Sequence, residues 1–275
     1  MADVFSSLQR PKKLTLTATD GRTYALLCKP GDDLRKDARV VEVQALINTL
    51  MRRDREAQRR ALLLRLYAAL PLTDRCGILE WVPNTTTWRH LLRELYAEVG
   101  VALDNRAVTA YFTQVPADNV LAKRECFARL LRHYPPVFDR WFVRTFAEPS
   151  RWLASRLRYA RSLAVLSMVG FIMGLGDRHT ENLLFDSTTG DALNVDLNCI
   201  FQRAETFEVP ERVPFRLTQN LRDAMGVSRE EGVYRRCCEI SLGMLRNNRA
   251  TLMSVLETLT HDPLVEWQRR SSQHH

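Results

Sequence analysis

Three polar side chains in one short stretch of the chain could carry out chemistry together. The stretch runs from Gly174 to Asp196 and reads GLGDRHTENLLFDSTTGDALNVD. Asp177 follows an apolar run, Asn182 comes five residues later, and Asp196 lies fourteen residues after that. Asn182 and Asp196 supply the hard oxygen ligands that suit Mg²⁺ when the ion also binds phosphate. Asp177 could then accept the proton of a hydroxyl group, and His179 could donate a hydrogen bond to a phosphoryl group in transfer.

Each of these residues by itself has an ordinary structural explanation. The stretch Asp177-Arg178-His179 could form a salt bridge within a loop, with a hydrogen-bonded histidine. Asn182 could lie in a turn, and Asp196 could cap a strand. The combination is more specific, because protein kinases place a base aspartate five residues before a metal-binding asparagine and a second metal-binding aspartate after a hairpin. The spacing therefore predicts transfer of a phosphoryl group from a nucleotide.

A lysine further upstream is a candidate for binding the nucleotide phosphates. The segment KKLTLTATDGRTYALLCKP predicts a β-hairpin, because an Asp-Gly turn joins two alternating runs, and Lys29 ends the second run. Apolar residues at spacings of three and four then predict a helix, with Asp37 near its start. A lysine held by an acidic helix residue contacts phosphate in kinases. The alternative is a solvated charge at the edge of the sheet.

The segment before this lysine lacks the usual phosphate-binding loop. No G-x-G-x-x-G motif precedes Lys29, which argues against an ordinary eukaryotic protein kinase. A nucleotide site would therefore need residues 6–9 (SSLQ) to cover the phosphates with hydroxyl and backbone N–H groups.

The remaining elements predict a sheet followed by a helical region. Two strand-like runs, Leu62–Leu70 and Gly77–Val82, join the hairpin in a sheet of four or five strands with one helix. Helical periodicity dominates after Glu80–Asn84, and a threonine among residues 85–87 is the expected N-cap. The last of these helices is apolar nearly all round in its second half and ends at Gly174, so it would support the polar stretch rigidly. Helices are expected over residues 88–99, 119–133, 136–144 and 150–174.

Composition indicates a globular protein. The 275 residues are 45% hydrophobic and 26% charged, and six cysteines form no C-x-x-C pair, so a zinc site is not expected. The net charge of +8 fits anionic partners or a solvated excess of arginine, and the run RRDREAQRR lacks the interleaved aromatics of a nucleic-acid patch. The N-terminus shows no secretory signal, and the longest apolar run of 13 residues is short of the ~20 that span a bilayer. A soluble intracellular protein is the expectation.

The chain resembles a known family at these residues. The segments CKPGDDLRKD, GFIMGLGDRHTENLLFD and ETFEVPERVPFRLTQN are similar to those of the phosphatidylinositol-kinase-related protein kinases, in particular the ATR-type checkpoint branch. The resemblance implies an α+β, two-lobed kinase-like fold. A small, mostly antiparallel N-lobe would span residues 1–82 and a mainly helical C-lobe residues 83–275. The catalytic loop would be 174–182 and the activation segment 196–218.

The resemblance also implies the site residues and cofactors, which are ATP with Mg²⁺ or Mn²⁺. Lys29 would contact the ATP phosphates with Asp37 as its partner, below a loop that contains Ser7. Asp177 would be the catalytic base and His179 a phosphate-stabilising residue, while Asn182 and Asp196 would bind the metal. The residues expected to line the adenine pocket are Tyr67, Leu79, Trp81 and Val82. A tryptophan in the place of Trp81 is more often a core or interface residue, so its adenine role depends on the other motifs.

The function that the resemblance implies is phosphorylation of Ser or Thr followed by Gln, in nuclear DNA-damage checkpoint signalling. An ATRIP-like partner is expected for the full-length kinase, and direct contact of this domain with a membrane or nucleic acid is not. The chain would correspond to the catalytic domain only, without the family's helical-repeat region and C-terminal FATC segment, so low autonomous activity is expected. Asp196-Leu197-Asn198 also departs from the usual Asp-Phe-Gly or Asp-Phe-Asn.

Two alternatives stay open at this point. The first is a lipid kinase of the same fold, which would read anionic headgroups with a basic activation segment. Residues 198–214 oppose this alternative, because they contain Arg203 and Arg212 against Glu205, Glu208 and Glu211. The second is a truncated, non-catalytic scaffold, which the complete set of metal ligands disfavours and the expected lack of the FATC segment favours.

Overall fold

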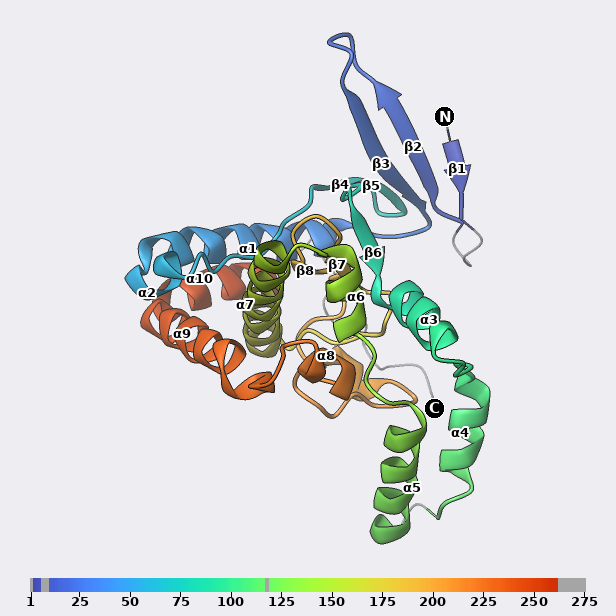
Figure 1. Cartoon of the computed structure of the whole chain (residues 1–275). Coiled ribbons are helices and arrows are strands. Elements are labelled where there is room, and N and C mark those ends of the chain that lie inside the picture. Colours follow the sequence, from blue (N-terminus) through green and yellow to red (C-terminus); the bar gives the residue numbers. More distant parts are fainter. Residues whose placement is uncertain (1, 6–9, 117–118, 262–275) are drawn as a thin grey trace, which may run out of the picture.

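The computed structural model describes residues 2–5, 10–116 and 119–261 and places an antiparallel sheet at the start of the chain (Figure 1). The strands lie in the order β1-β2-β3-β5-β4, and β2 and β3 form the predicted hairpin. Gly21 in its turn has a φ of +80°, which glycine adopts without steric cost. The strands are β1 (Ala2–Val4), β2 (Lys12–Thr17), β3 (Thr23–Pro30), β4 (Ala69–Thr73) and β5 (Cys76–Glu80).

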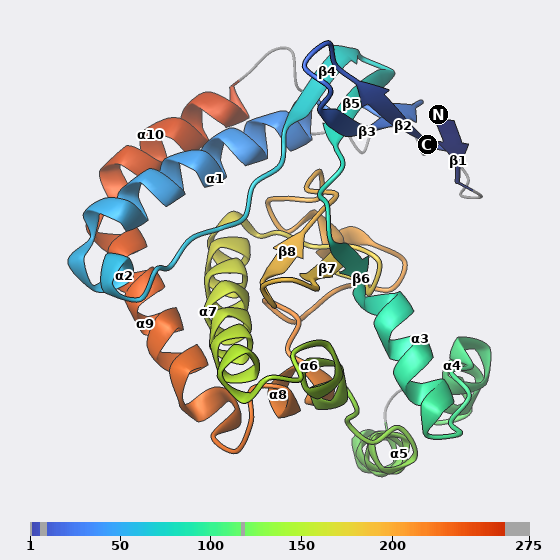
Figure 2. The same ribbon diagram turned by 45° about the horizontal axis from the view of Figure 1, so that its top comes forward.

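One long helix accompanies this sheet. Helix α1 (Arg35–Arg53) follows β3 and is continued by the short α2 (Arg55–Arg59), which Asp54 caps by accepting a hydrogen bond from the N–H of Ala57. The buried face of α1 repeats at three and four residues, as the sequence predicts, and includes Val40, Val43, Ile47 and Met51. In Figure 2, α1 lies beside α10 (Arg249–Thr260), and the two helices are in contact.

The strand expected over Leu62–Leu70 does not form along most of that run. Residues 62–67 lie outside the strands, Ala68 accepts the N–H of Glu80 at 2.8 Å, and β4 begins at Ala69. In this run, the side chain of Asn48 on α1 donates to the carbonyl of Leu64 at 2.8 Å and accepts its N–H at 2.7 Å. These two bonds use the backbone groups of Leu64 that a neighbouring strand would need.

A second, small sheet joins the two parts of the chain. Strand β6 (Thr85–Thr87) pairs antiparallel with β7 (Leu183–Asp186), which pairs with β8 (Ala192–Asn194). Thr87 also caps α3 (Trp88–Glu98) by accepting the N–H of His90 at 3.4 Å, so the predicted threonine cap forms. The predicted lobe boundary at residues 82 and 83 falls between β5 and β6 and stays a prediction.

Helix α7 (Pro149–Met173) is central to the helical part, where it packs against α9 (Val233–Asn247) and β8. Its end at Gly174 is sharp: this glycine has a φ of +58°, and a Cβ there would lie 2.6 Å from the backbone nitrogen of Gln202. Helices α4 and α5 extend away from the body in Figure 1. The other helices of this part are α4 (Asn105–Thr113), α5 (Val120–His133), α6 (Asp139–Thr145) and α8 (Gln219–Asp223).

The α+β fold class is confirmed, with an antiparallel sheet in the N-terminal part and mainly helices after it. Aromatic rings fill the centre of the helical part, where Phe138 contacts Trp141, Phe142, Tyr159 and Phe185. Within the described ranges, every helix is too short or too polar to cross a bilayer.

Candidate active site

A cleft of about 280 Å³ lies between the two sheets and collects most of the residues singled out in the sequence. Its lining includes Lys29, Asn182 and Asp196, which come from β3, the loop before β7 and the segment after β8. The predicted apolar residues among its walls are Tyr67, Leu79, Trp81 and Val82. Ser7 lies outside the described residues.

Lys29 faces two carboxylates in this cleft. Its Nζ lies 3.2 Å from Oδ2 of Asp32 and 3.6 Å from Oδ1 of Asp196, and its side chain is 13% exposed. Burial would lower the pKa of Lys29, but the negative charges of Asp196, Asp32 and Asp37 outweigh that effect and raise it. The ammonium is therefore fully charged at neutral pH and stands opposite Asp196.

Asp37 occupies a different place from the one expected. The ion pairs of Lys29 within the described ranges are with Asp32 and Asp196, and Asp37 acts on it at longer range. Asp37 is fully buried behind the cleft, and its Oδ1 accepts the backbone N–H of Leu197 at 2.8 Å. Burial raises the pKa of Asp37 to about 6. Asp32 is closer to the lysine because the tight turn through Gly31, with φ of +78°, returns the chain toward the end of β3.

Asn182 and Asp196 come together because their neighbours pair in the small sheet. Leu183 pairs with Asn194, and the N–H of Val195 donates to the carbonyl of Asn182 at 3.0 Å. The Nδ2 of Asn182 donates to the carbonyl of Asp177 at 2.9 Å, which leaves the amide oxygen to bind a cation.

These residues fit a metal that arrives with a nucleotide. Within the described ranges, no three His, Cys, Asp or Glu residues gather in a metal site of their own. One amide oxygen and one carboxylate, together with phosphate oxygens, are a set that suits Mg²⁺. The donor chemistry of Asn182 and Asp196 is therefore compatible with a metal–nucleotide complex.

Asp177 and His179 lie beside the cleft, on the loop that follows α7. Both side chains are partly exposed, at 37% and 48%, and Nε2 of His179 is 3.9 Å from Oδ1 of Asp177. The N–H of Glu181 donates to Nδ1 of His179 at 3.2 Å, so Nε2 is the nitrogen that carries the proton in the neutral ring. Asp177 has a φ of +59°, a conformation that aspartate adopts more readily than most residues.

Two residues that hold this loop were missed in the sequence. Arg178 is buried, and its guanidinium donates to the carbonyls of Gly176 at 2.7 Å, Val195 at 2.9 Å and Asp196. Glu211 accepts the backbone N–H of Asp177 at 2.8 Å. The position of Arg178 between Asp177 and His179 could have indicated that it holds this loop. For Glu211, the sequence shows a charged residue and nothing that indicates its contact with Asp177.

The apolar end of the cleft also contains residues beyond those predicted. Leu27, Leu184 and Val195 complete its walls, and Thr85, Thr87 and Glu181 lie at its polar side. Trp81 donates its backbone N–H to Ala25 at 3.0 Å. Its ring stacks on Phe5 with centroids 5.8 Å apart, and Nζ of Lys13 lies 4.2 Å from its centre.

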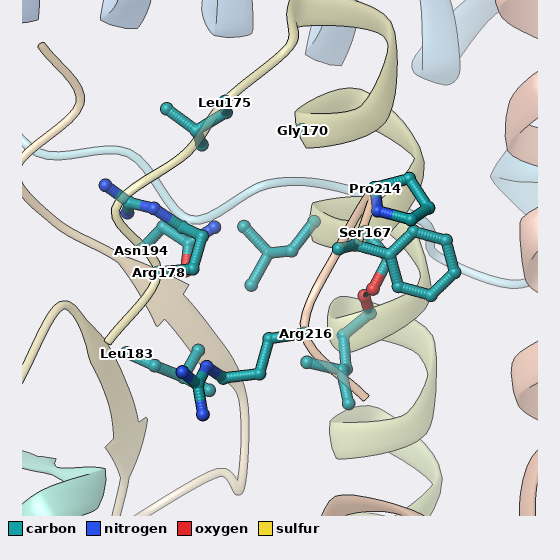
Figure 3. Close-up of a pocket in the computed structure, with 11 residues that line it drawn as sticks. Ser167, Gly170, Leu175, Arg178, Leu183, Asn194, Pro214 and Arg216 are labelled. Carbon is teal, nitrogen blue, oxygen red and sulfur yellow. Dashed lines mark hydrogen bonds between the residues drawn. The ribbon is translucent and has the colours of Figure 1, made fainter. Parts of the chain in front are cut away.

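A second, smaller cavity of about 30 Å³ lies behind the catalytic loop (Figure 3). In Figure 3, Ser167 and Gly170 lie on α7 with Pro214 beside them, and Arg178 and Leu183 lie on the opposite side. Burial lowers the pKa of Arg216, and the negative charge of Glu211, which would raise it, offsets only part of this effect. Since this space holds about one water molecule, we assign it to packing between α7, the loop and the activation segment.

Comparisons with known proteins agree with the resemblance. Residues 23–269 match the family described as phosphatidylinositol 3- and 4-kinase. Serine/threonine-protein kinase ATR of Arabidopsis thaliana is 49% identical over 98% of this chain and 10% of that protein. Protein kinase rad3 of Schizosaccharomyces pombe is 46% identical over 98% of this chain and 11% of that protein. The chain spans about a tenth of the length of these curated relatives.

A solved structure supports the same assignment. The FAT and kinase domain of CtTel1 superposes with a TM-score of 0.91 and 36% identity, over 97% of this chain and 19% of that one. The resemblance to phosphatidylinositol-kinase-related kinases is therefore confirmed. The chain belongs to the phosphatidylinositol 3- and 4-kinase family, which implies the use of ATP and a divalent metal.

Proposed function

We propose that this chain transfers the γ-phosphate of ATP to serine and threonine hydroxyl groups of proteins, as the catalytic part of a DNA-damage checkpoint kinase. The observation that carries the proposal is the convergence of Lys29, Asn182 and Asp196 on one cleft, next to Asp177. The charges and oxygen ligands at one end, and the apolar walls at the other, fit the two ends of a nucleotide.

Each polar residue then has a defined task. Lys29 binds phosphate oxygens, while Asp177 accepts the proton of the attacking hydroxyl group. His179 donates through Nε2 to the phosphoryl group, where negative charge accumulates. A divalent metal held by Asn182 and Asp196 neutralises phosphate charge when bound. Mg²⁺ is the proposed ion, and Mn²⁺ can replace it, since both prefer oxygen ligands.

Protein substrates are favoured over lipid headgroups by the charge of the activation segment. Glu205, Glu208 and Glu211 outnumber the two arginines of residues 198–214, so this segment does not attract an anionic headgroup. We extend the proposal, from the names of the relatives and the sequence resemblance, to Ser-Gln and Thr-Gln sites, to a nuclear location and to an ATRIP-like partner for the longer kinase.

The test measures phosphate transfer from Mg·ATP to a Ser-Gln peptide, a Ser-Ala peptide and phosphoinositide vesicles. The expected result is transfer to the Ser-Gln peptide that falls at least about a hundredfold in the Asp177→Asn variant, the scale of general-base catalysis. Equal transfer by both proteins refutes the proposed base, and faster turnover of vesicles than of peptide identifies a lipid kinase. Absence of thermal stabilisation by Mg·ATP identifies a non-catalytic scaffold.

A further inference from the structure

Two aspartates near the start of α1 contact different partners. Asp32 pairs with Lys29 at 3.2 Å, and the two side chains are 15% and 13% exposed. Asp37, one turn into the helix region, instead reaches the N–H of Leu197 on the activation segment, 160 residues away. The ion pair with Lys29 that was expected of Asp37 is therefore made by Asp32.

The bond from Asp37 lies in a fully buried place. Asp37 and Leu197 each have 0% exposure, so water does not compete for the N–H. The other carboxylate oxygen of Asp37, Oδ2, has no hydrogen-bond partner among the described residues. A hydrogen bond to a charged acceptor is shorter and stronger than a neutral one, and its loss in a buried site leaves a backbone donor unsatisfied. The contact with Leu197 is thus the main polar interaction that Asp37 makes.

This bond fixes the backbone next to a predicted metal ligand. Asp196 has a φ of +58°, which an aspartate tolerates but does not prefer. Arg178 holds the carbonyls of Val195 and Asp196 from one side, and Asp37 holds the following N–H from the other. The peptide groups on both sides of the Asp196 side chain are therefore clamped.

We propose that Asp37 is a positioning residue for Asp196, acting through the Leu197 N–H, and that Asp32 is the partner that orients Lys29. This proposal rests on the proposed function, because it concerns how that same site holds its metal and nucleotide. Residues that orient metal ligands typically change metal affinity by about 10–100-fold when they are removed. Asp37→Ala should weaken metal-dependent nucleotide binding, whereas Asp32→Asn should weaken nucleotide binding with or without metal.

The test uses binding and hydrogen exchange, which need no turnover. The probes are Mn²⁺ with a non-hydrolysable ATP analogue, and the exchange rate of the Leu197 amide. Asp37→Ala should weaken Mn²⁺ binding to the nucleotide complex by about tenfold and speed the Leu197 exchange by at least about tenfold. Asp37→Asn, whose amide oxygen can still accept the bond, should recover most of both effects.

One control separates positioning from charge. Asp33→Asn removes a neighbouring carboxylate that pairs with Arg35, and should alter neither readout. The proposal is overturned if Asp37→Asn binds as weakly as Asp37→Ala while the Leu197 amide stays protected in both. If Asp37→Ala does not fold, the affinities of Asp37→Asn and Asp32→Asn for the Mn²⁺–nucleotide complex are compared instead. The proposal requires that Asp37→Asn bind this complex more tightly than Asp32→Asn, and the reverse order overturns it. Failure of the proposed function would appear in a different measurement, as phosphate transfer to the Ser-Gln peptide that is equal in the unmodified chain and in Asp177→Asn.

Discussion

The backbone N–H of Asp177 donates a hydrogen bond of 2.8 Å to the carboxylate of Glu211, 34 residues further along the chain. This bond joins the predicted catalytic loop, residues 174–182, to the second half of the predicted activation segment, residues 196–218. It also lies next to a backbone in the left-handed region, at φ of +59°, whose conformation needs support. The position of the proposed base therefore depends on a residue that is distant in the sequence.

Glu211→Ala should lower kcat more than it raises KM for ATP, because the nucleotide cleft does not contain Glu211. The expected loss is about tenfold or more in kcat, since a misplaced base loses part of its contribution. Glu211→Gln keeps an oxygen acceptor and should stay within about threefold of the unmodified chain. Steady-state kinetics with varied ATP test this, and equal losses in the two variants would show that the charge of Glu211 is what matters.

Arg178 should be important for stability as well as for the site. Arg178→Ala removes three hydrogen bonds to backbone carbonyls. The free energy of unfolding should therefore fall by about 3–5 kcal/mol, as it does when one partner of a buried charged network is removed. Arg178→Lys should recover part of the loss, because one ammonium cannot reproduce the planar fork. Urea denaturation followed by far-UV circular dichroism measures both. A loss below about 1 kcal/mol, as for surface arginines, contradicts the prediction.

Asp37 should make the stability of the nucleotide-free chain depend on pH. Its pKa is about 6 in the folded chain against 3.8 as the ordinary value, so the folded state disfavours the carboxylate. Stability from this group is present below pH 3.8 and is lost as the pH rises through about 6. The full effect above pH 6 is about 3 kcal/mol, from about 1.4 kcal/mol per pKa unit.

Asp37→Asn should therefore be the more stable protein at pH 7.5, and its advantage should shrink toward pH 4.5. Urea denaturation at the two pH values measures the difference. Asp33→Asn is the matched control. Hydrogen bonds from Arg35 lower the pKa of Asp33, so the effect of Asp33→Asn on stability should change with pH in the opposite direction. A constant difference between Asp37→Asn and the unmodified chain across this range contradicts the assignment.

Arg65 links the segment after α2 to the second sheet and should contribute more than a surface arginine. Its guanidinium bonds the buried carboxylate of Asp186, and its second nitrogen donates to the carbonyl of Pro83 at 3.2 Å. Arg65→Ala leaves Asp186 without its cation and should cost about 3 kcal/mol. Arg59→Ala, which removes an exposed pair with Glu56, should cost less than about 0.5 kcal/mol.

The Asp186 carboxylate also gives a pH test of this link. Burial would raise the pKa of Asp186, but the hydrogen bonds from Thr188 and Arg65 outweigh it and lower the pKa. The stability it provides is present above pH 3.8 and is lost as the pH falls through the lower folded value. The stability difference between Arg65→Ala and the unmodified chain should therefore narrow in strong acid, and calorimetry below pH 4 measures it.

The site could be predicted where local signals decide the geometry. The Asp-Gly turn, the apolar helix before Gly174 and the hairpin between Asn182 and Asp196 all follow from neighbours in the sequence. The roles of the individual site residues stay predictions until the experiments above are made.

The remaining features depend on contacts that no local pattern contains. Asn48 binds the backbone of Leu64 through two bonds across 16 residues, in a run that was expected to be a strand. The choice of Asp32 over Asp37 as the partner of Lys29 depends on the tight turn through Gly31. Glu211 reaches Asp177 only because the activation segment folds back on the loop. Spacing arguments do not resolve such contacts.

The burial of Asp37 has a mechanical consequence. Helix α1 contacts α9 and α10, while Asp37 in its first turn accepts the N–H of Leu197. The peptide that follows Asp196 is therefore tied to a helix that also packs against the C-terminal helices of the described chain. A change in the tilt of α1 would move the carboxylate that holds this peptide, although neither α9 nor α10 lines the nucleotide cleft.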